Sequence, residues 1–135
     1  MNLASRIVSQ ACEVSADTVY EFAHRVENLP RWAAGLTTQL VHEDGEWFTD
    51  TPDGRIRIAM APRNAFRVMD HDVTLPGGLT VHNAFRVTPT GDGSLLSFVV
   101  LRLPDATDDA FERDCGHVAA DLRTLKTLLE HPPAT

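Results

Sequence analysis

His71 and Asn83 are the two side chains whose types and spacing most directly suggest chemistry. They flank the turn signal Pro76-Gly77-Gly78, with alternating apolar residues on both sides. A three-residue hairpin loop there predicts that His71 lies opposite Asn83, with both side chains on the same face of a sheet. A neutral imidazole exchanges protons near neutral pH, and an amide beside it can hold a carbonyl or enolate oxygen. The pair is a candidate general acid/base site, and a core histidine satisfied by Asn83 is the alternative interpretation.

The opposite face of the same hairpin carries charge. The register places Asp72 opposite His82 and Asp70 diagonal to Arg86, which predicts a surface ion-pair ladder. A loop shifted by one residue would bury both carboxylates instead, which is disfavoured because unpaired buried charges are costly.

Further turn signals extend the inner, apolar face across a sheet. A tight turn at 44–45 and four-residue loops at 51–54 and 62–65 set the pairing, the last of them with Met60 opposite Arg67. For the strand at 94–103, both faces are apolar and parity does not decide which one points inward. Beside His71 and Asn83, the predicted cavity lining is Leu40, His42, Trp47, Ile56, Ile58, Met60, Met69, Val73, Val81 and Phe85, with Phe111, Cys115, Val118 and Leu122 from the last helix.

The elements that position these residues follow from periodicity and capping signals. We expect a strand over 5–14, a helix over 16–26 that begins after Ser15, and a short helical turn over 31–34. Trp32 in that turn is expected to cap one end of a pocket, or to serve simply as a core residue. Six strands joined by five turns fill 36–103, and a long amphipathic helix spans 107–130. This is an α+β arrangement in a single domain, 1–135, with seven strands in total.

Composition excludes several classes of protein. The chain has 135 residues and a net charge of −7, with one lysine and scattered arginines, which disfavours nucleic acid or an anionic membrane as a partner. Cys12 and Cys115 lack the spacing of a zinc site or a disulfide framework, so no metal and no cofactor are predicted. The absence of a long apolar run or an N-terminal apolar segment favours a cytoplasmic location.

The element order resembles the SRPBCC superfamily, also called START or Bet v 1-like, and more locally its bacterial polyketide cyclase/dehydrase-related members. The resemblance implies a helix-grip fold, in which a curved seven-stranded antiparallel sheet surrounds the C-terminal helix and two short helices follow the first strand. It covers about 5–130, and its segments are Trp32-Ala33-Ala34-Gly35, Val68 to Val73, Arg86-Val87, Gly91 to Ser94, Phe111 to Asp114 and Asp121 to Lys126.

Three functions remain open at this stage. The first is binding of a small hydrophobic molecule, possible ligands being aromatic or polyketide-like, between the sheet and the C-terminal helix. The second is a cofactor-free cyclase or dehydratase in which His71 is the general acid/base and Asn83 holds the oxygen. The third is a protein-interaction module. The sequence leaves the ligand and the oligomeric state undetermined.

Overall fold

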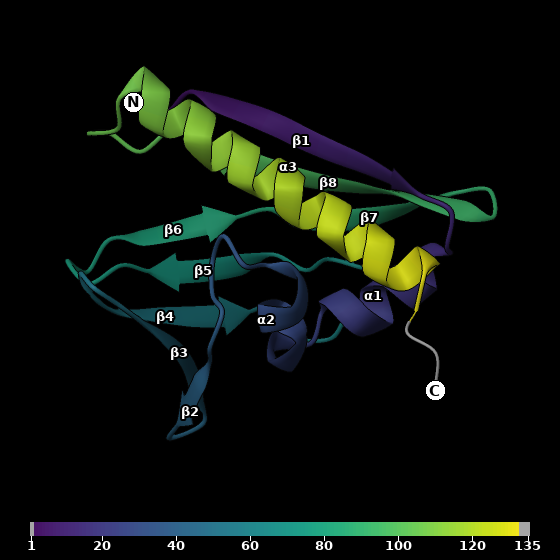
Figure 1. Cartoon of the computed structure of the whole chain (residues 1–135), viewed down its shortest axis with the longest axis horizontal. Coiled ribbons are helices and arrows are strands. Elements are labelled where there is room, and N and C mark those ends of the chain that lie inside the picture. The colour runs from purple at the N-terminus through teal and green to yellow at the C-terminus, as the bar shows by residue number, and fades with distance from the viewer. Residues whose placement is uncertain (1, 133–135) are drawn as a thin grey trace.

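The computed structural model describes residues 2–132, and its elements follow the predicted order (Figure 1). In chain order they are β1 (Ser5–Cys12), α1 (Ala16–Ala23), the 3₁₀ helix η1 (Val26–Asn28), α2 (Leu29–Trp32), β2 (Val41–Glu43), β3 (Glu46–Thr51), β4 (Gly54–Met60), β5 (His71–Thr74), β6 (Thr80–Asn83), β7 (Phe85–Thr90), β8 (Gly93–Leu101) and α3 (Asp108–Glu130).

The structure has eight strands in two sheets, so the prediction of seven strands in one sheet is wrong. A three-stranded sheet has the order β1-β8-β7, and a five-stranded sheet has the order β2-β3-β4-β5-β6. The sequence predicts one continuous strand between the turns at 76–78 and 89–93. In the structure this strand is interrupted at Ala84, which gives β6 and β7. Before Ala84 it pairs with β5, and after Ala84 it pairs with β8. The change of partner turns the strand direction, which is how corners form between sheets.

The connection between β4 and β5 is longer than the predicted four-residue loop. Met60 pairs with His71, not with Arg67. The reason is Asn64, whose Oδ1 accepts from the backbone N–H of Val68 at 3.1 Å and whose Nδ2 donates to the Val68 carbonyl at 2.9 Å. These bonds satisfy backbone groups that a strand ladder would otherwise pair. The shift from position 67 to position 71 is even, so the residues of β4 stay on their predicted faces.

Ser15 caps the first helix as predicted, and Thr107, which was predicted as the first residue of the last helix, caps α3. The side chains of Ser15 and Thr107 each accept a hydrogen bond at 3.1 Å from the backbone N–H three residues further along. The first helix is shorter than predicted and ends at Ala23. Pro30 stands in the first turn of α2, which therefore begins at Leu29 and not at residue 31. Proline is compatible with that position because the N–H it lacks has no partner in a first helical turn.

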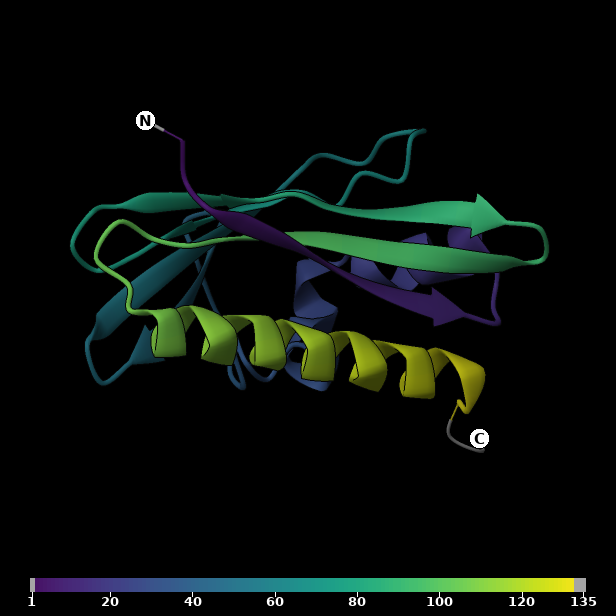
Figure 2. The same ribbon diagram turned by 90° about the horizontal axis from the view of Figure 1, so that it is seen from above.

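Helix α3 lies along the inner side of β1 and β8, while α1 and α2 cover the same side further along the molecule (Figures 1 and 2). Its apolar stripe faces the sheet, with Leu122 and Leu125 almost completely buried and Val118 half-buried. Val118, at the flank of this stripe, borders a cavity.

Candidate functional site

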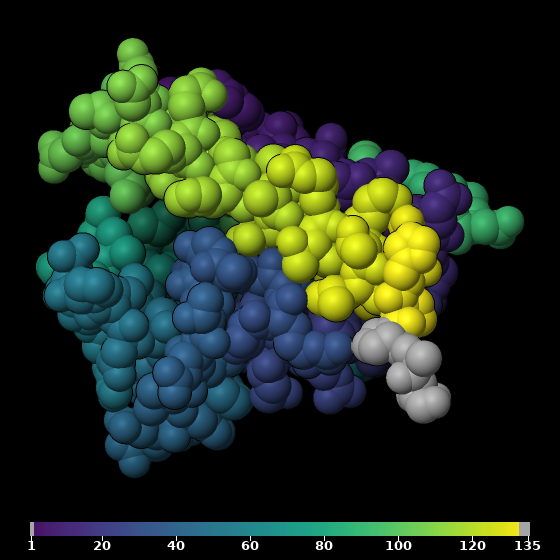
Figure 3. All heavy atoms as spheres, viewed as in Figure 1, coloured from purple at the N-terminus to yellow at the C-terminus, as the bar shows by residue number. Residues whose placement is uncertain are grey.

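A cavity of about 190 Å³ lies between α3, α2, β8 and the β5–β6 hairpin. In Figure 3 the surface is hollowed where the first half of α3, the segment after α2 and the strands of the five-stranded sheet meet. Most of the lining is aliphatic or aromatic, with polar groups at a few points. The lining residues are Leu29, Trp32, Ala33, Gly35, Leu36, His71, Val73, Val81, Asn83, Phe98, Val100, Leu101, Leu103, Asp114, His117, Val118, Asp121 and Leu122.

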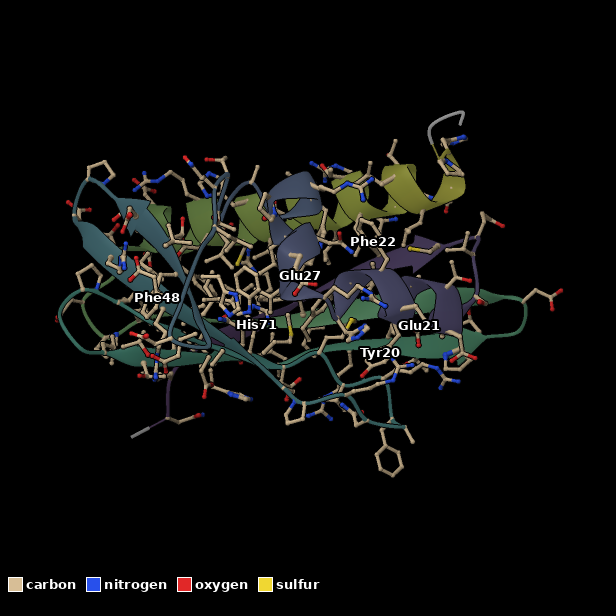
Figure 4. The ribbon with its side chains drawn as sticks, turned by 90° about the horizontal axis from the view of Figure 1, so that it is seen from below. Tyr20, Glu21, Phe22, Glu27, Phe48 and His71 are labelled. Carbon is tan, nitrogen blue, oxygen red and sulfur yellow. The ribbon has the colours of Figure 1, made fainter. Side chains whose placement is uncertain are left out.

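His71 is the buried polar group of this cavity, and it lies in the interior between the sheet and the helices (Figure 4). Its Nδ1 is 3.1 Å from the backbone carbonyl of Met69. Because a carbonyl oxygen only accepts, Nδ1 must carry a proton. Burial lowers the pKa of His71, which keeps the ring neutral near pH 7. The neutral ring therefore has its lone pair on Nε2, which has no hydrogen-bond partner among residues 2–132.

Asn83 pairs directly with His71 across β5 and β6, as the hairpin length predicts. Residues in such a pair have Cβ atoms about 4.5–5.5 Å apart and share a face. Both side chains line the cavity, and Asn83 is half-buried. Within the described part of the chain, its amide makes no side-chain hydrogen bond. The alternative in which Asn83 satisfies the histidine is not what the structure contains, since Met69 supplies the bond.

Trp32 of α2 lines the cavity and is 3% exposed. Its indole Nε1 is buried and has no partner in the described residues. A buried donor without an acceptor costs about 1–3 kcal/mol, so such groups are uncommon in folded proteins. The ring is fixed by the neighbouring Phe85 ring, with centroids 5.6 Å apart. Phe98, whose ring centroid is 5.3 Å from that of Phe85, also lines the cavity, so Trp32 and Phe98 form an aromatic wall with Phe85 packed behind it.

Three charged or titratable side chains of α3 reach the cavity from its other side. Asp114, His117 and Asp121 share a helix face because they are three and four residues apart. Asp121 accepts a hydrogen bond from the backbone N–H of Gly35 at 3.3 Å, which ties α3 to the segment after α2. Burial raises the pKa of Asp121, and the Gly35 hydrogen bond opposes that shift. His117 and Asp114 are exposed, so this side forms the mouth.

Only some of the predicted lining residues border this cavity. Of the predicted set, Trp32, His71, Val73, Val81, Asn83, Val118 and Leu122 line it. The residues of the predicted set that lie elsewhere are Leu40, His42, Trp47, Ile56, Ile58, Met60, Met69, Phe85, Phe111 and Cys115.

For the residues of β2, β3 and β4, the physical reason is the segment 33–40, which packs against the inner side of these outer strands, whereas Met69, Phe85, Phe111 and Cys115 are buried in the core. Leu36 and Leu40 of this segment pack against the core. Buried Thr37 donates to Thr49 of β3 at 2.9 Å, which holds the segment in place. The predicted neighbours His42 and Trp47 do pair, and their ring centroids are 4.1 Å apart in a stacked arrangement. Neither residue lines the cavity.

Sequence reasoning missed several lining residues, among them Asp121 and Phe98. The signal for Asp121 was present, since it lies three residues after the predicted lining residue Val118 on the helix. For Phe98, the alternation along β8 left the inward face open, and the structure shows Leu96, Phe98 and Val100 buried. The structure contains the predicted charged ladder, because Asp72 pairs with His82 at 2.7 Å and Asp70 pairs with Arg86 at 3.2 Å.

Comparisons with known proteins bear on the fold. No family model matches the chain, and no curated protein matches it. Among solved structures, the Aha1 dimer from Colwellia psychrerythraea is similar with a TM-score of 0.74 and 12% identity, covering 98% of this chain and 100% of that one. DynU16, described as a putative protein in the dynemicin biosynthetic locus, has a TM-score of 0.70 and 14% identity, covering 94% of this chain and 47% of that one.

A third similar structure is Ara h 8.0201, with a TM-score of 0.64 and 10% identity, covering 96% of this chain and 99% of that one. The class is therefore that of Bet v 1-like, helix-grip folds, in which a curved antiparallel sheet holds a long C-terminal helix. None of the helices in residues 2–132 is both long and apolar enough to cross a membrane.

Proposed function

We propose that this protein binds a small apolar molecule in the cavity between α3 and the β5–β6 hairpin. The observation that carries the proposal is a mostly apolar cavity lined by a few polar groups with unused hydrogen-bonding capacity, which are the Trp32 Nε1, the His71 Nε2 and the Asn83 amide. Ligand sites commonly have this composition. The fold of DynU16, which is described as coming from a biosynthetic locus, supports a small-molecule role.

The volume of the cavity limits the size of the ligand. A cavity of about 150 Å³ is known to hold benzene, whereas pockets for drug-sized ligands span about 300–1,000 Å³. At about 190 Å³ this cavity fits a compact molecule of one or two rings. A polyketide-like ligand of that kind is a short, cyclised one rather than an extended chain.

Binding is tested by thermal unfolding with 2-naphthol, together with a variant that fills the cavity. We expect saturating 2-naphthol to raise the Tm by about ten degrees, since a ligand at 100 times its Kd stabilises the folded state by about 2.7 kcal/mol. Val118→Phe places a larger side chain in the cavity and should abolish the shift. Ile7→Phe, at a position 69% exposed, is the matched control and should keep it. An unchanged Tm in the wild-type protein, or an equal shift in Val118→Phe, contradicts the proposal.

A second candidate function is proton transfer at a carbon next to a carbonyl group. It is favoured by the neutral His71 ring, whose Nε2 lone pair is free, directly opposite Asn83. In such a reaction Nε2 removes the α-proton, and the Asn83 amide donates a hydrogen bond to the enolate oxygen that forms. The imidazolium then returns the proton to carbon or to the oxygen, which completes an enolisation.

The enzyme hypothesis predicts catalysed hydrogen–deuterium exchange at the α-carbons of 2-tetralone, a two-ring ketone, followed by NMR in D₂O. His71→Gln should slow the catalysed exchange by about 10²–10⁴-fold, because glutamine cannot take the proton. His82→Gln, on the outer face of the same hairpin, is the control and should leave the rate unchanged. Exchange no faster than in buffer, or equal in wild type and His71→Gln, rejects the enzyme hypothesis and leaves ligand binding.

A further inference from the structure

The polar atoms of the His71–Asn83 pair present a defined hydrogen-bonding pattern to a ligand. The bond from Nδ1 to the Met69 carbonyl fixes the proton of the neutral ring on Nδ1, so Nε2 can only accept. His71 is 5% exposed, and no described side chain supplies a donor to Nε2. An unpaired acceptor that faces a mostly apolar cavity favours a ligand that brings a donor.

Asn83 adds an adaptable partner next to that acceptor. Its amide can both donate and accept, it lies directly across the hairpin from His71, and it also lines the cavity. A hydroxyl group fits both neighbours at once, because one O–H donates to Nε2 while the oxygen lone pairs accept from the Asn83 amide. A carbonyl oxygen can accept from the Asn83 amide but has no proton to donate to Nε2.

The charges of the cavity disfavour an anionic ligand, and the burial of His71 disfavours a charged group beside it. Asp114 and Asp121 stand on the α3 side of the cavity, and the chain carries a net charge of −7, so a carboxylate would meet like charge. An ammonium group beside His71 would lose its hydration. The carboxylates that could compensate for this loss lie on the opposite side of the cavity. A neutral group that both donates and accepts remains.

We infer that the cavity selects a compact one- or two-ring molecule with a hydroxyl group, which donates to Nε2 of His71 and accepts from the side-chain amide of Asn83. This inference rests on the proposed ligand-binding function and specifies its chemistry. The ring system lies against the aromatic wall that Trp32 and Phe98 form, and its edge faces Val118 and Leu122.

The test compares three ligands of one skeleton by titration calorimetry: 2-naphthol, 2-methoxynaphthalene and naphthalene. The methyl ether accepts but cannot donate, and naphthalene does neither. We expect 2-naphthol to bind roughly tenfold more tightly than the methyl ether, which is the range for one buried hydrogen bond whose loss leaves its partner unsatisfied. Equal affinity of 2-naphthol and the methyl ether overturns the inference while leaving ligand binding in place. If none of the three binds, the proposed function fails and the inference fails with it.

Substitutions at His71 and Asn83 test whether these residues cause the preference for 2-naphthol. His71→Phe keeps a ring but removes the acceptor, and it should bring the affinities of 2-naphthol and the methyl ether together. Asn83→Leu should weaken 2-naphthol more than naphthalene. His82→Phe, which changes a histidine on the outer face of the same hairpin, should keep the wild-type preference. A preference that survives in His71→Phe contradicts the assignment.

A measurement on the unaltered protein covers the case in which a variant does not fold. In a ¹⁵N NMR spectrum of the imidazole groups, the Nε2 resonance of His71 should move when 2-naphthol is added, because Nε2 then accepts a hydrogen bond. Naphthalene should leave the resonance nearly in place. A shift of the same size with both ligands reports ring proximity alone and overturns the hydroxyl contact.

Discussion

Phe85→Ala is expected to lower the free energy of unfolding by about 3–5 kcal/mol, which is the usual cost of removing a fully buried aromatic side chain. Phe85 has no exposed surface and contacts the rings of Trp32, His71 and Phe98. It is also the first residue of β7, directly after the point where the ribbon changes sheets. Its loss therefore removes packing at the junction between the two sheets.

Urea denaturation of the wild type and two variants measures this effect. Phe66→Ala is the matched control, since Phe66 is 82% exposed and its truncation should change stability by no more than about 0.5 kcal/mol. Phe85→Leu keeps most of the volume and should cost less than Phe85→Ala, which covers the case in which the alanine variant unfolds. If Phe85→Ala lowers the free energy of unfolding no more than Phe66→Ala does, the packing of Phe85 against its aromatic neighbours does not stabilise the fold.

Asp70→Ala is expected to destabilise the protein by about 2–3 kcal/mol near pH 7, because it leaves a backbone donor without its partner. Val99 N–H donates to the Ala84 carbonyl at 2.9 Å, which makes Phe85 a non-hydrogen-bonded position of the β7–β8 ladder. The N–H of Phe85 therefore points away from β8, and it donates to Oδ1 of Asp70 at 2.8 Å. The Asp70 carboxylate therefore accepts the hydrogen bond that a carbonyl of a neighbouring strand would otherwise accept.

The stability of the wild type should also depend on pH through this group. Burial by itself would raise the pKa of Asp70, but hydrogen bonds from Arg86 and from the Phe85 N–H outweigh it and lower the pKa below its usual value of 3.8. The unfolded state then binds the proton more readily than the folded state. The contribution is complete above the unfolded pKa and is lost as the pH falls through the folded one.

Urea denaturation from pH 6 down to pH 2 measures that dependence. Below about pH 4 the stability of Asp70→Ala should fall less steeply with decreasing pH than that of the wild type. Asp72→Ala removes the neighbouring, exposed carboxylate of the same ladder, and we expect it to change stability by less than about 1 kcal/mol. Equal losses in the Asp70 and Asp72 variants would mean that the Phe85 N–H contact contributes nothing.

Local patterns in the sequence were sufficient for several parts of the site. The Pro76-Gly77-Gly78 turn and strict alternation on both sides determined that His71 pairs with Asn83, and the structure has that register. Ser15 marked the start of the first helix because its hydroxyl caps the backbone within one turn. These features depend on residues close together in the chain, where few competing arrangements exist.

Contacts between distant residues decided the rest. The loop at 61–70 is held by Asn64 and by the Tyr20 hydroxyl, which accepts from the Asn64 N–H at 3.0 Å, and no pattern within the loop predicts a partner 44 residues away. The position of the cavity depended on segment 33–40, whose leucines fill the space inside the outer strands.

The sequence by itself therefore determined the order of elements, the inward side of most strands and the two polar residues that share the inner face. Only the tertiary structure decided where the interior stays unfilled, which tautomer of His71 the Met69 carbonyl selects, and which side chains of α3 border the mouth. The physical reason is that alternation and capping act over a few residues, whereas a cavity is the space left after all side chains have packed.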